Sequence, residues 1–435
     1  MITRSESERV ASAVAADELY ARIARHIIPI FLISYIIAYL DRVNVGFAKL
    51  QMMGDLKFTD SIYGLGAGIF FVGYFLFEVP SNIILHKVGA RFWLCRVLVT
   101  WGIISGCTAL VRTPWEFYTC RFLLGLAEGG FFPGMVLYLT YWFPSHRRAK
   151  MMALLMAGNP ISGIVGGPLS GYILHHFANS PRMAGWQWLF IIEAAPAVVL
   201  GLIMYFYLDD RLAQAEWLTR PEKDVVTFEI DKESSYKTHR TVASVFTSPR
   251  VLLMCAILFT LCMGSYAIGF WQPTIIRQTG VKDPLIIGLL TMLPYGLALI
   301  SMVMVGRHAD KTRERRWHLA IPNIIAAAGF LLCPHAGSNT TLAMASLVMS
   351  VMGVVTALPM FWALPTSFLA DSAAAAGLAL INSTGNLAGF LSPTLIGILK
   401  THTGTLNSGL YMVAACHIMA VILIIAFVPA KLVNR

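Results

Sequence analysis

The sequence predicts an all-α membrane protein, in which about twelve transmembrane helices form two six-helix bundles and both termini are cytoplasmic. The chain is 57% hydrophobic and only 13% charged, whereas soluble domains are about 45–50% apolar and about 25% charged. Its apolar residues fall into about twelve runs of roughly 20 residues, each long enough to span the hydrocarbon core as a helix. A long polar stretch, residues 209–250, separates two sets of six runs.

The elements follow in order from this pattern. Residues 1–26 are polar and lack the apolar core of a signal peptide, so the first span must act as its own membrane signal. We expect an N-terminal bundle over residues 27–208, with spans at 27–47, 62–85, 92–111, 115–143, 151–174 and 186–208. The linker 209–250 carries one surface helix. The C-terminal bundle covers 251–428, with spans at 251–275, 284–305, 317–335, 342–365, 375–399 and 408–428, before a cytoplasmic tail at 429–435.

The basic charge is a signal of topology. The net charge is +10, but most of the 33 Lys and Arg fall in segments that this topology places in the cytoplasm, as the positive-inside rule requires. The expected surroundings are therefore a lipid bilayer, with no nucleic-acid partner. The seven Cys lie in or beside spans without a CxxC pair, which is typical of packing residues rather than disulfides or metal ligands.

Four charged residues lie inside predicted spans of the first half. Asp41 and Arg42 interrupt span 1, and Arg121 and Glu128 lie seven residues apart on span 4, so they share one helix face. A charge at the bilayer centre costs roughly 2.5–3.5 kcal/mol on insertion scales. The four charges sum to zero, so mutual neutralisation is feasible.

Two interpretations of this set remain open. One is a structural network of ion pairs, although a buried pair is often no more stabilising than apolar residues of the same volume. The other is an organic-anion site coupled to protons. Arginine binds carboxylates with a planar fork of donors, and a buried carboxyl group can load and release a proton.

No phosphate-binding loop, metal-spaced cluster or catalytic triad is present in the sequence, so we expect neither an enzyme nor a cofactor beyond the proton.

Other polar groups in the spans are assigned simpler roles. Glu78 and Glu193 are interpreted as packing or gate hydrogen-bonding groups, and His417 as a packed core histidine. Gly163, Gly166, Gly167, Pro168 and Gly171 favour close helix packing. The second half offers an uncharged wall of aromatic and amide side chains, which are Tyr266, Phe270, Trp271, Gln272, Phe361, Trp362, Asn382 and Asn386.

Several long motifs are similar to those of a known family. They are YLDRVNVGFA at 39–48, GLGAGIFF at 64–71, FEVPSN at 77–82, RFLLGLAE at 121–128 and WQWLF at 186–190. With these motifs the chain resembles the major facilitator superfamily, and within it the anion:cation symporter family. It is most similar there to the bacterial tartrate, phthalate and hydroxyphenylacetate permeases.

The resemblance implies alternating access around a midplane site and proton-driven uptake of an organic anion. It implies that Asp41 and Glu128 form the proton-coupling pair and that Arg121 is tied to Glu128. The substrate positions that it implies are Tyr39, Arg42, Tyr74, Arg121, Asn159, Trp362 and Asn382. Gating or structural positions are Glu78, Gly306, Asp310 and Arg315. Some acidic-sugar carriers have Gln in place of Asn159 and hydroxyl residues near Phe361, so a polyhydroxylated sugar acid is disfavoured.

We therefore expect a monomeric symporter of a small aromatic or dicarboxylic acid in a bacterial inner membrane. One alternative is a proton-driven exporter of drugs or metabolites, which would have less need of Arg42 and Arg121. Another is a ligand sensor built on a transporter fold, but the linker 209–250 is short for a signalling domain. The sequence does not specify which acid is carried.

Overall fold

The computed structural model describes residues 4–234, 248–365 and 372–430, and in this part of the chain the regular elements are helices. The first half contains α1 (Arg4–Leu56), α2 (Asp60–Val88), α3 (Ala90–Cys107), η1 (Thr108–Leu110), α4 (Pro114–Glu128), α5 (Phe131–Thr140), α6 (Ser145–Met156), α7 (Gly158–His176) and α8 (Gly185–Tyr207). The polar stretch that follows contains η2 (Leu212–Gln214) and α9 (Arg220–Ser234). The second half contains α11 (Pro249–Gln278), α12 (Pro284–Thr312), α13 (Arg316–Leu332), η3 (Cys333–His335), α14 (Thr340–Trp362), α16 (Ser372–Thr403) and α17 (Asn407–Phe427).

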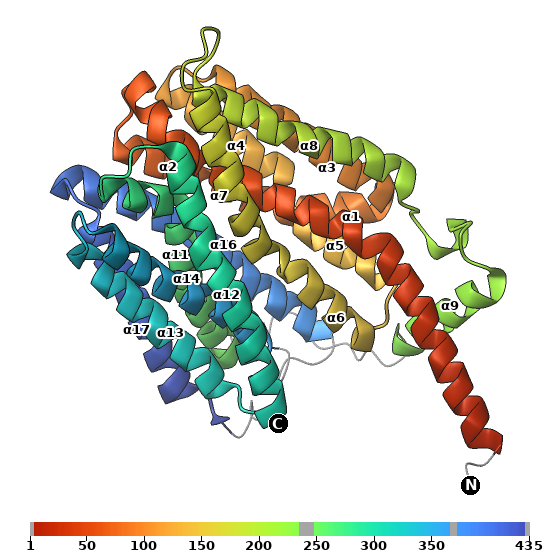
Figure 1. Ribbon diagram of the computed structural model, residues 1–435. Coiled ribbons are helices and arrows are strands. Elements are labelled where there is room, and N and C mark those ends of the chain that lie inside the picture. The colour runs from red at the N-terminus through yellow and green to blue at the C-terminus, as the bar shows by residue number, and fades with distance from the viewer. Residues whose placement is uncertain (1–3, 235–247, 366–371, 431–435) are drawn as a thin grey trace.

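These helices form the two-bundle, twelve-span architecture that the sequence predicts. Eleven candidate spans in the described residues are long and apolar enough to cross a membrane, and α16 is a further long helix that packs against α2 and α11. In Figure 1 the red to yellow-green helices of the first half form one group and the teal to blue helices of the second half form the other. The start of α1 and the end of α17 both lie at the lower side of this view.

Local sequence signals account for where several helices begin. Thr59 accepts a hydrogen bond from the Ile62 amide and caps α2. Thr113 and Glu116 form a reciprocal capping box at the start of α4, where Pro114 takes the first helical position. Such caps satisfy backbone amides that have no partner within the helix. Asp283 and Asn339 cap α12 and α14 in the same way, by accepting from the amides of Leu285 and Leu342.

The fourth span is two helices rather than the single long helix expected over 115–143. Helix α4 ends at Glu128 and α5 begins at Phe131, and Gly130 between them has φ +88°. Pro133 lacks an amide hydrogen and its ring clashes with the carbonyl four residues earlier, so the helix breaks just before it. A side chain at Gly130 would also collide with Ser81. The break makes Glu128 the last residue of a helix.

Further differences concern helix lengths. The fifth span is also divided, into α6 and α7, and the division falls next to Asn159 and Pro160. The expected boundary between residues 26 and 27 lies inside α1. The basic segment 306–316, predicted as a loop, is mostly helical, because α12 continues to Thr312 and only residues 313–315 separate it from α13. Helices therefore extend past the apolar runs from which the spans were counted.

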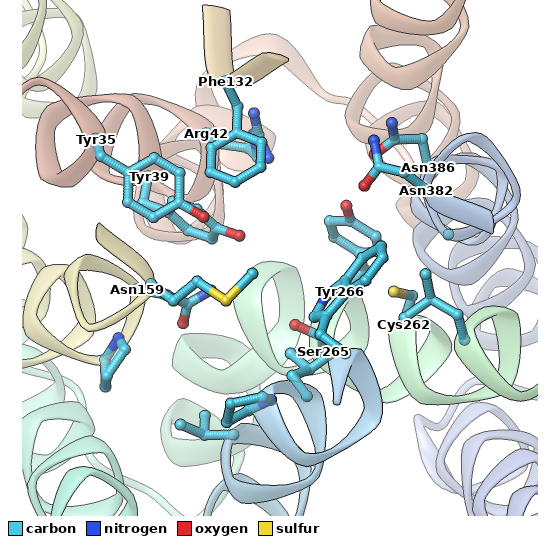
Figure 2. A pocket seen from close by; sticks show the side chains of 18 of the residues that line it. Tyr35, Tyr39, Arg42, Phe132, Asn159, Cys262, Ser265, Tyr266, Asn382 and Asn386 are labelled. Atoms are coloured by element: carbon cyan, nitrogen blue, oxygen red, sulfur yellow. The ribbon is translucent and has the colours of Figure 1, made fainter. Parts of the chain in front are cut away.

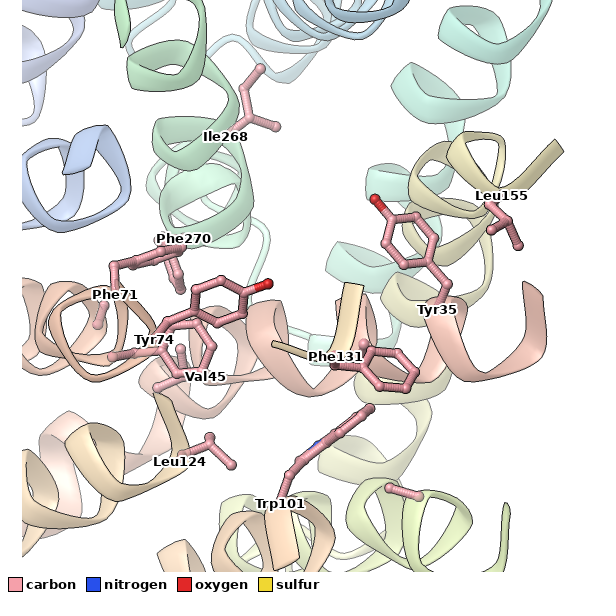
Figure 3. Close-up of a cluster of buried hydrophobic side chains, with 14 of the residues drawn as sticks. Tyr35, Val45, Phe71, Tyr74, Trp101, Leu124, Phe131, Leu155, Ile268 and Phe270 are labelled. Atoms are coloured by element: carbon pink, nitrogen blue, oxygen red, sulfur yellow. The ribbon is translucent and has the colours of Figure 1, made fainter. Parts of the chain in front are cut away.

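The hydrophobic core runs across both halves. Figure 3 shows Trp101 beside Phe131 in the first half, with ring centroids 5.3 Å apart. Phe71 and Phe270, from opposite halves, lie edge to face at 6.2 Å. Edge-to-face aromatic pairs are favourable beyond the area that they bury. The Phe71–Phe270 pair therefore joins α2 of the first half to α11 of the second.

Glycines allow the two halves to approach closely on their outer side. Helix α7 meets α12 at Gly171 and Gly288, where a Cβ on Gly288 would lie 3.1 Å from the Gly171 Cα. Helix α2 meets α16 in the same way at Gly64 and Gly397. Backbone contact of this kind requires small residues at the interface. The glycine row predicted to support close packing on span 5 is thus used in a contact between the halves.

We expect Gly288→Leu to prevent this closure. The new side chain would collide with the α7 backbone, so the outer side should open and expose the cavity residue Cys262. The measurement is labelling of Cys262, as the only cysteine retained, by a membrane-impermeant maleimide added outside vesicles; the rate should rise several-fold. Gly296→Leu on the same helix is the control, because a Cβ there would meet nothing within 4 Å. Equal labelling of the two variants would show that the contact between Gly171 and Gly288 does not close the outer side.

Candidate functional site

A cavity of about 140 Å³ lies between the two halves. Its first-half wall comes from α1, α2, α5, α6 and α7, and its second-half wall from α11, α12, α14 and α16. The lining residues are Tyr35, Tyr39, Arg42, Tyr74, Phe132, Met156, Asn159, Pro160, Leu258, Cys262, Ser265, Tyr266, Met302, Val355, Leu358, Pro359, Trp362, Asn382, Gly385 and Asn386. Figure 2 shows Arg42, Tyr35 and Tyr39 on one side, and Tyr266 with the two asparagines on the other. Among the described residues of this lining, Arg42 is the one that carries a charge.

Arg42 is held in place by one carboxylate and four aromatic rings. Its Nη2 forms an ion pair with Glu128 Oε1. The guanidinium carbon lies 5.2 to 5.9 Å from the ring centroids of Tyr39, Tyr74, Phe70 and Phe71. Each ring face attracts the cation, and the Nε group has no hydrogen-bond partner among the residues that the structure describes. A planar donor group therefore faces the cavity with part of its hydrogen-bonding capacity unused.

Asp41 lies on the other side of α1, away from the cavity. It is 1% exposed and accepts hydrogen bonds from Trp101 Nε1 at 2.6 Å, Ser105 Oγ at 3.3 Å and Asn44 Nδ2 at 3.4 Å. All three donors are neutral side chains, and no ion pair to Asp41 is present among the described residues. A buried carboxyl group without a counter-ion avoids the cost of its charge by taking up a proton.

Glu128 and Arg121 are not bonded to each other, although the resemblance implies that they are tied together. Glu128 pairs with Arg42 instead. Arg121 is 0% exposed and donates from Nε to the Gly66 carbonyl at 3.3 Å. Its guanidinium also lies over Phe70 and does not line the cavity. The expected four-charge network is thus one ion pair flanked by an acid and a base that are each held by neutral groups.

The remaining predicted positions divide between the cavity and other places. Tyr39, Tyr74, Asn159, Tyr266, Trp362, Asn382 and Asn386 line it together with Arg42. Phe270 and Trp271 are buried on the outer side and do not line the cavity.

The predicted gating and packing residues lie elsewhere. Gly306 and Asp310 lie within α12, and Arg315 donates to the Ala363 carbonyl at 3.3 Å. Glu193 accepts from Ser170 at 2.6 Å, and His417 contacts Asn323 at 2.8 Å, as expected of packed groups.

Glu78 connects the halves beside the cavity. It lies one turn after Tyr74 on α2, and its two oxygens accept hydrogen bonds from Asn382 at 3.0 Å and Asn386 at 3.3 Å. Both amides belong to the cavity wall. The sequence predicted both asparagines as part of the uncharged wall, but it did not indicate that a carboxylate from the other half binds both.

Some site residues had no signal in the sequence. Tyr35 and Ser265 line the cavity, and Trp101 and Ser105 bind Asp41. Each is a residue type that is common in apolar spans, so composition did not mark it. Tyr35 could have been found from spacing, because it lies seven residues before Arg42 and therefore on the same face of α1.

A cavity at the boundary of two helical halves, with charged groups near its wall, is the arrangement of a secondary transporter. The sequence profile of the Major Facilitator Superfamily matches residues 31–393, and the chain belongs to this superfamily. It is accordingly a multi-pass membrane transporter of a small molecule.

Known proteins are similar to nearly the whole chain. A Pseudomonas putida protein named "Putative metabolite transport protein NicT" is 44% identical, covering 96% of each chain. A "Putative tartrate transporter" of Agrobacterium vitis is 44% identical over 94% of this chain and 92% of its own. A "Quinolone resistance transporter" of Acinetobacter baumannii is 39% identical over 91% and 92%. The solved inward open xylose transporter XylE from E. coli matches with TM-score 0.75 at 15% identity, covering 93% and 96%.

We predict that the ion pair of Arg42 and Glu128 is energetically coupled. Glu128→Gln should lower the free energy of unfolding by about 3–5 kcal/mol, because it leaves a buried guanidinium without its counter-ion. The double variant Arg42→Gln/Glu128→Gln should lose less than the sum of the two single variants. Reversible unfolding in mixed micelles measures this cycle, with Glu193→Gln as a control outside the pair. Additive losses would show that the two side chains do not interact.

Proposed function

We propose that this chain is a proton-coupled importer of a small organic carboxylate, acting by alternating access in a bacterial inner membrane. The observation that carries the proposal is the position of Arg42, which faces the cavity while it pairs with the buried Glu128. A substrate carboxylate and Glu128 can then bind the same guanidinium in turn. Protonation of Glu128 as the substrate arrives keeps the buried charge balanced, since one negative partner replaces another.

Asp41 offers a second proton site, on α1 next to Arg42. Its neutral partners suit either protonation state. Trp101 donates to Oδ2 and Ser105 to Oδ1, and when Oδ1 carries the proton the Ser105 hydroxyl can turn to accept from it while Trp101 keeps its bond. Glu128 pairs with the cavity cation Arg42, whereas Asp41 lies within the first half and does not line the cavity. This arrangement supports a proton path that passes through the first half while the second half supplies uncharged contacts to the substrate.

The shape of the cavity supports small aromatic or dicarboxylic acids. Its volume of about 140 Å³ is close to that of cavities that hold benzene, about 150 Å³, and below the roughly 300–1,000 Å³ of drug-sized pockets. Tyrosine rings on both walls can stack on a flat substrate, and Asn159, Asn382 and Asn386 supply amide groups for a second polar group. The relatives named as tartrate transporters are consistent with a dicarboxylate.

Transport into proteoliposomes tests the coupling. Carboxylates from a panel of tartrate, benzoate, 4-hydroxyphenylacetate and gluconate should accumulate only with an inward proton gradient. Asp41→Asn and Glu128→Gln should abolish accumulation but retain exchange of substrate across the membrane. Glu193→Gln, which alters another buried carboxyl of the first half, should still accumulate substrate. Accumulation that is equal with and without the gradient would rule out the proton coupling.

The second candidate is a proton-driven exporter, which the relative named for quinolone resistance favours. The two functions differ in what binds and in which direction it moves. We expect the anions of the panel to compete with one another in a thermal-shift assay and the cation ethidium not to compete. Arg42→Gln should remove the shift that is produced by the anions. An exporter of cationic drugs would give the opposite selectivity and would tolerate Arg42→Gln.

A further inference from the structure

Two lysines and one aspartate join the halves at the outer surface. Lys49 lies on α1, Asp60 begins α2 and Lys400 lies near the end of α16. The Nζ atoms of Lys49 and Lys400 lie 2.7 and 3.1 Å from the same oxygen, Asp60 Oδ1. One carboxylate thus serves two ammonium groups from opposite halves, and the cluster keeps an excess positive charge.

This cluster lines a second pocket, of about 350 Å³, which is separate from the central cavity. Arg277 adds a further cation to its wall and donates to the Leu50 carbonyl. Among the described lining residues, three are cationic and Asp60 is the one acid. The lining residues are Lys49, Leu50, Met53, Gly54, Asp60, Thr274, Arg277, Gln278 and Lys400. Such a pocket attracts anions, because its low-dielectric walls concentrate the field of the cations.

The position of Lys49 connects this pocket with the central cavity. Lys49 follows Arg42 by seven residues, so the two cations share one face of α1 about 10 Å apart along the helix. Lys49 is 5% exposed, and its Nζ lies 3.4 Å from the ring centroid of Trp271 and 4.3 Å from that of Tyr63. The charge is therefore buried on the route that an anion from outside would take towards Arg42.

An aromatic layer separates the two spaces. Tyr63 and Trp271 lie edge to face at 5.3 Å, and the Tyr63 hydroxyl donates to the Phe270 carbonyl at 2.8 Å. Phe71 lies beneath them and contacts the cavity residue Tyr266 at 4.4 Å between ring centroids. This aromatic layer joins α2 to α11. The cluster of Lys49, Asp60 and Lys400 above it joins α1 and α2 to α16. Both contacts must separate before the cavity can open to the outside.

We propose that the outer pocket is a carboxylate-binding site through which the substrate anion first engages the protein. The incoming carboxylate takes the place of Asp60 at Lys49 and Lys400, which releases the ionic contact between the halves. The identity of the ligand as a carboxylate rests on the proposed function. The existence of the site rests on the surplus of buried and partly buried cations in one pocket.

Protection of a cysteine tests the site without requiring transport. Met53→Cys, in a background with all seven native cysteines replaced by serine, places a thiol in the pocket. Its labelling by a membrane-impermeant maleimide is measured with 10 mM L-tartrate or benzoate, against chloride at equal ionic strength and without a proton gradient. We expect either carboxylate to slow labelling roughly three- to tenfold, as one or two charge pairs predict.

Three variants give results of opposite sign. Lys49→Gln and the less buried Lys400→Gln should remove the protection, whereas Asp60→Asn should strengthen it, because the lysines lose their built-in partner. Lys282→Gln, at an exposed outer lysine, should leave protection unchanged. If the cluster only closed the outer side, Asp60→Asn and Lys49→Gln would shift labelling in the same direction, and that result would contradict the proposed site. Equal labelling in carboxylate and in chloride would contradict it as well.

The outcome is distinguishable from that of the proposed function. Protection without proton-dependent accumulation would support the outer site and contradict the coupling. Accumulation without protection would support the proton coupling and contradict the proposed outer site.

Discussion

The buried pair of Arg42 and Glu128 is the interaction on which the rest of the site depends. It joins α1 to the end of α4, and both side chains lie where an unpaired charge would be costly. The break before Pro133 makes this geometry possible, since it ends α4 at Glu128. The carboxylate sits at the C-terminal end of a helix, where the helix dipole disfavours negative charge. Arg42 supplies the compensation, so a change at either residue affects the position of the other.

The division of labour between the halves follows from where charge is placed. The first half contains the ion pair and the hydrogen-bonded Asp41, whereas the second half contributes Tyr266, Trp362 and the two asparagines to the cavity. Charged residues of the second half also contact the first half at the outer surface, among them Lys400, Arg277 and Asp283. Movement of the second half therefore changes which uncharged groups face Arg42, while the charged groups of the first half remain together.

The sequence was sufficient for the architecture but not for the pairing of its charges. Span length, the polar linker and the distribution of Lys and Arg predicted two bundles, because these are properties of residue type and order. The partner of Glu128 depends on how α1 and α4 rotate against each other, and spacing within one helix does not determine this. Arg121 shares a face with Glu128, yet it donates to the Gly66 carbonyl, whereas Arg42 pairs with the carboxylate. The binding of Glu78 to both asparagines was similarly hidden, because its partners lie more than 300 residues away.

The four rings around Arg42 determine what happens when its carboxylate partner is neutralised. A guanidinium that was held by Glu128 alone would swing towards another acceptor once that charge disappeared. Here Tyr39, Tyr74, Phe70 and Phe71 contact it from several sides, and these contacts do not depend on protonation. Under the proposed mechanism the cation thus stays fixed while its counter-ion changes. Exchange of a proton for a substrate then changes the electric field around the Arg42 guanidinium. The arginine side chain itself does not have to move.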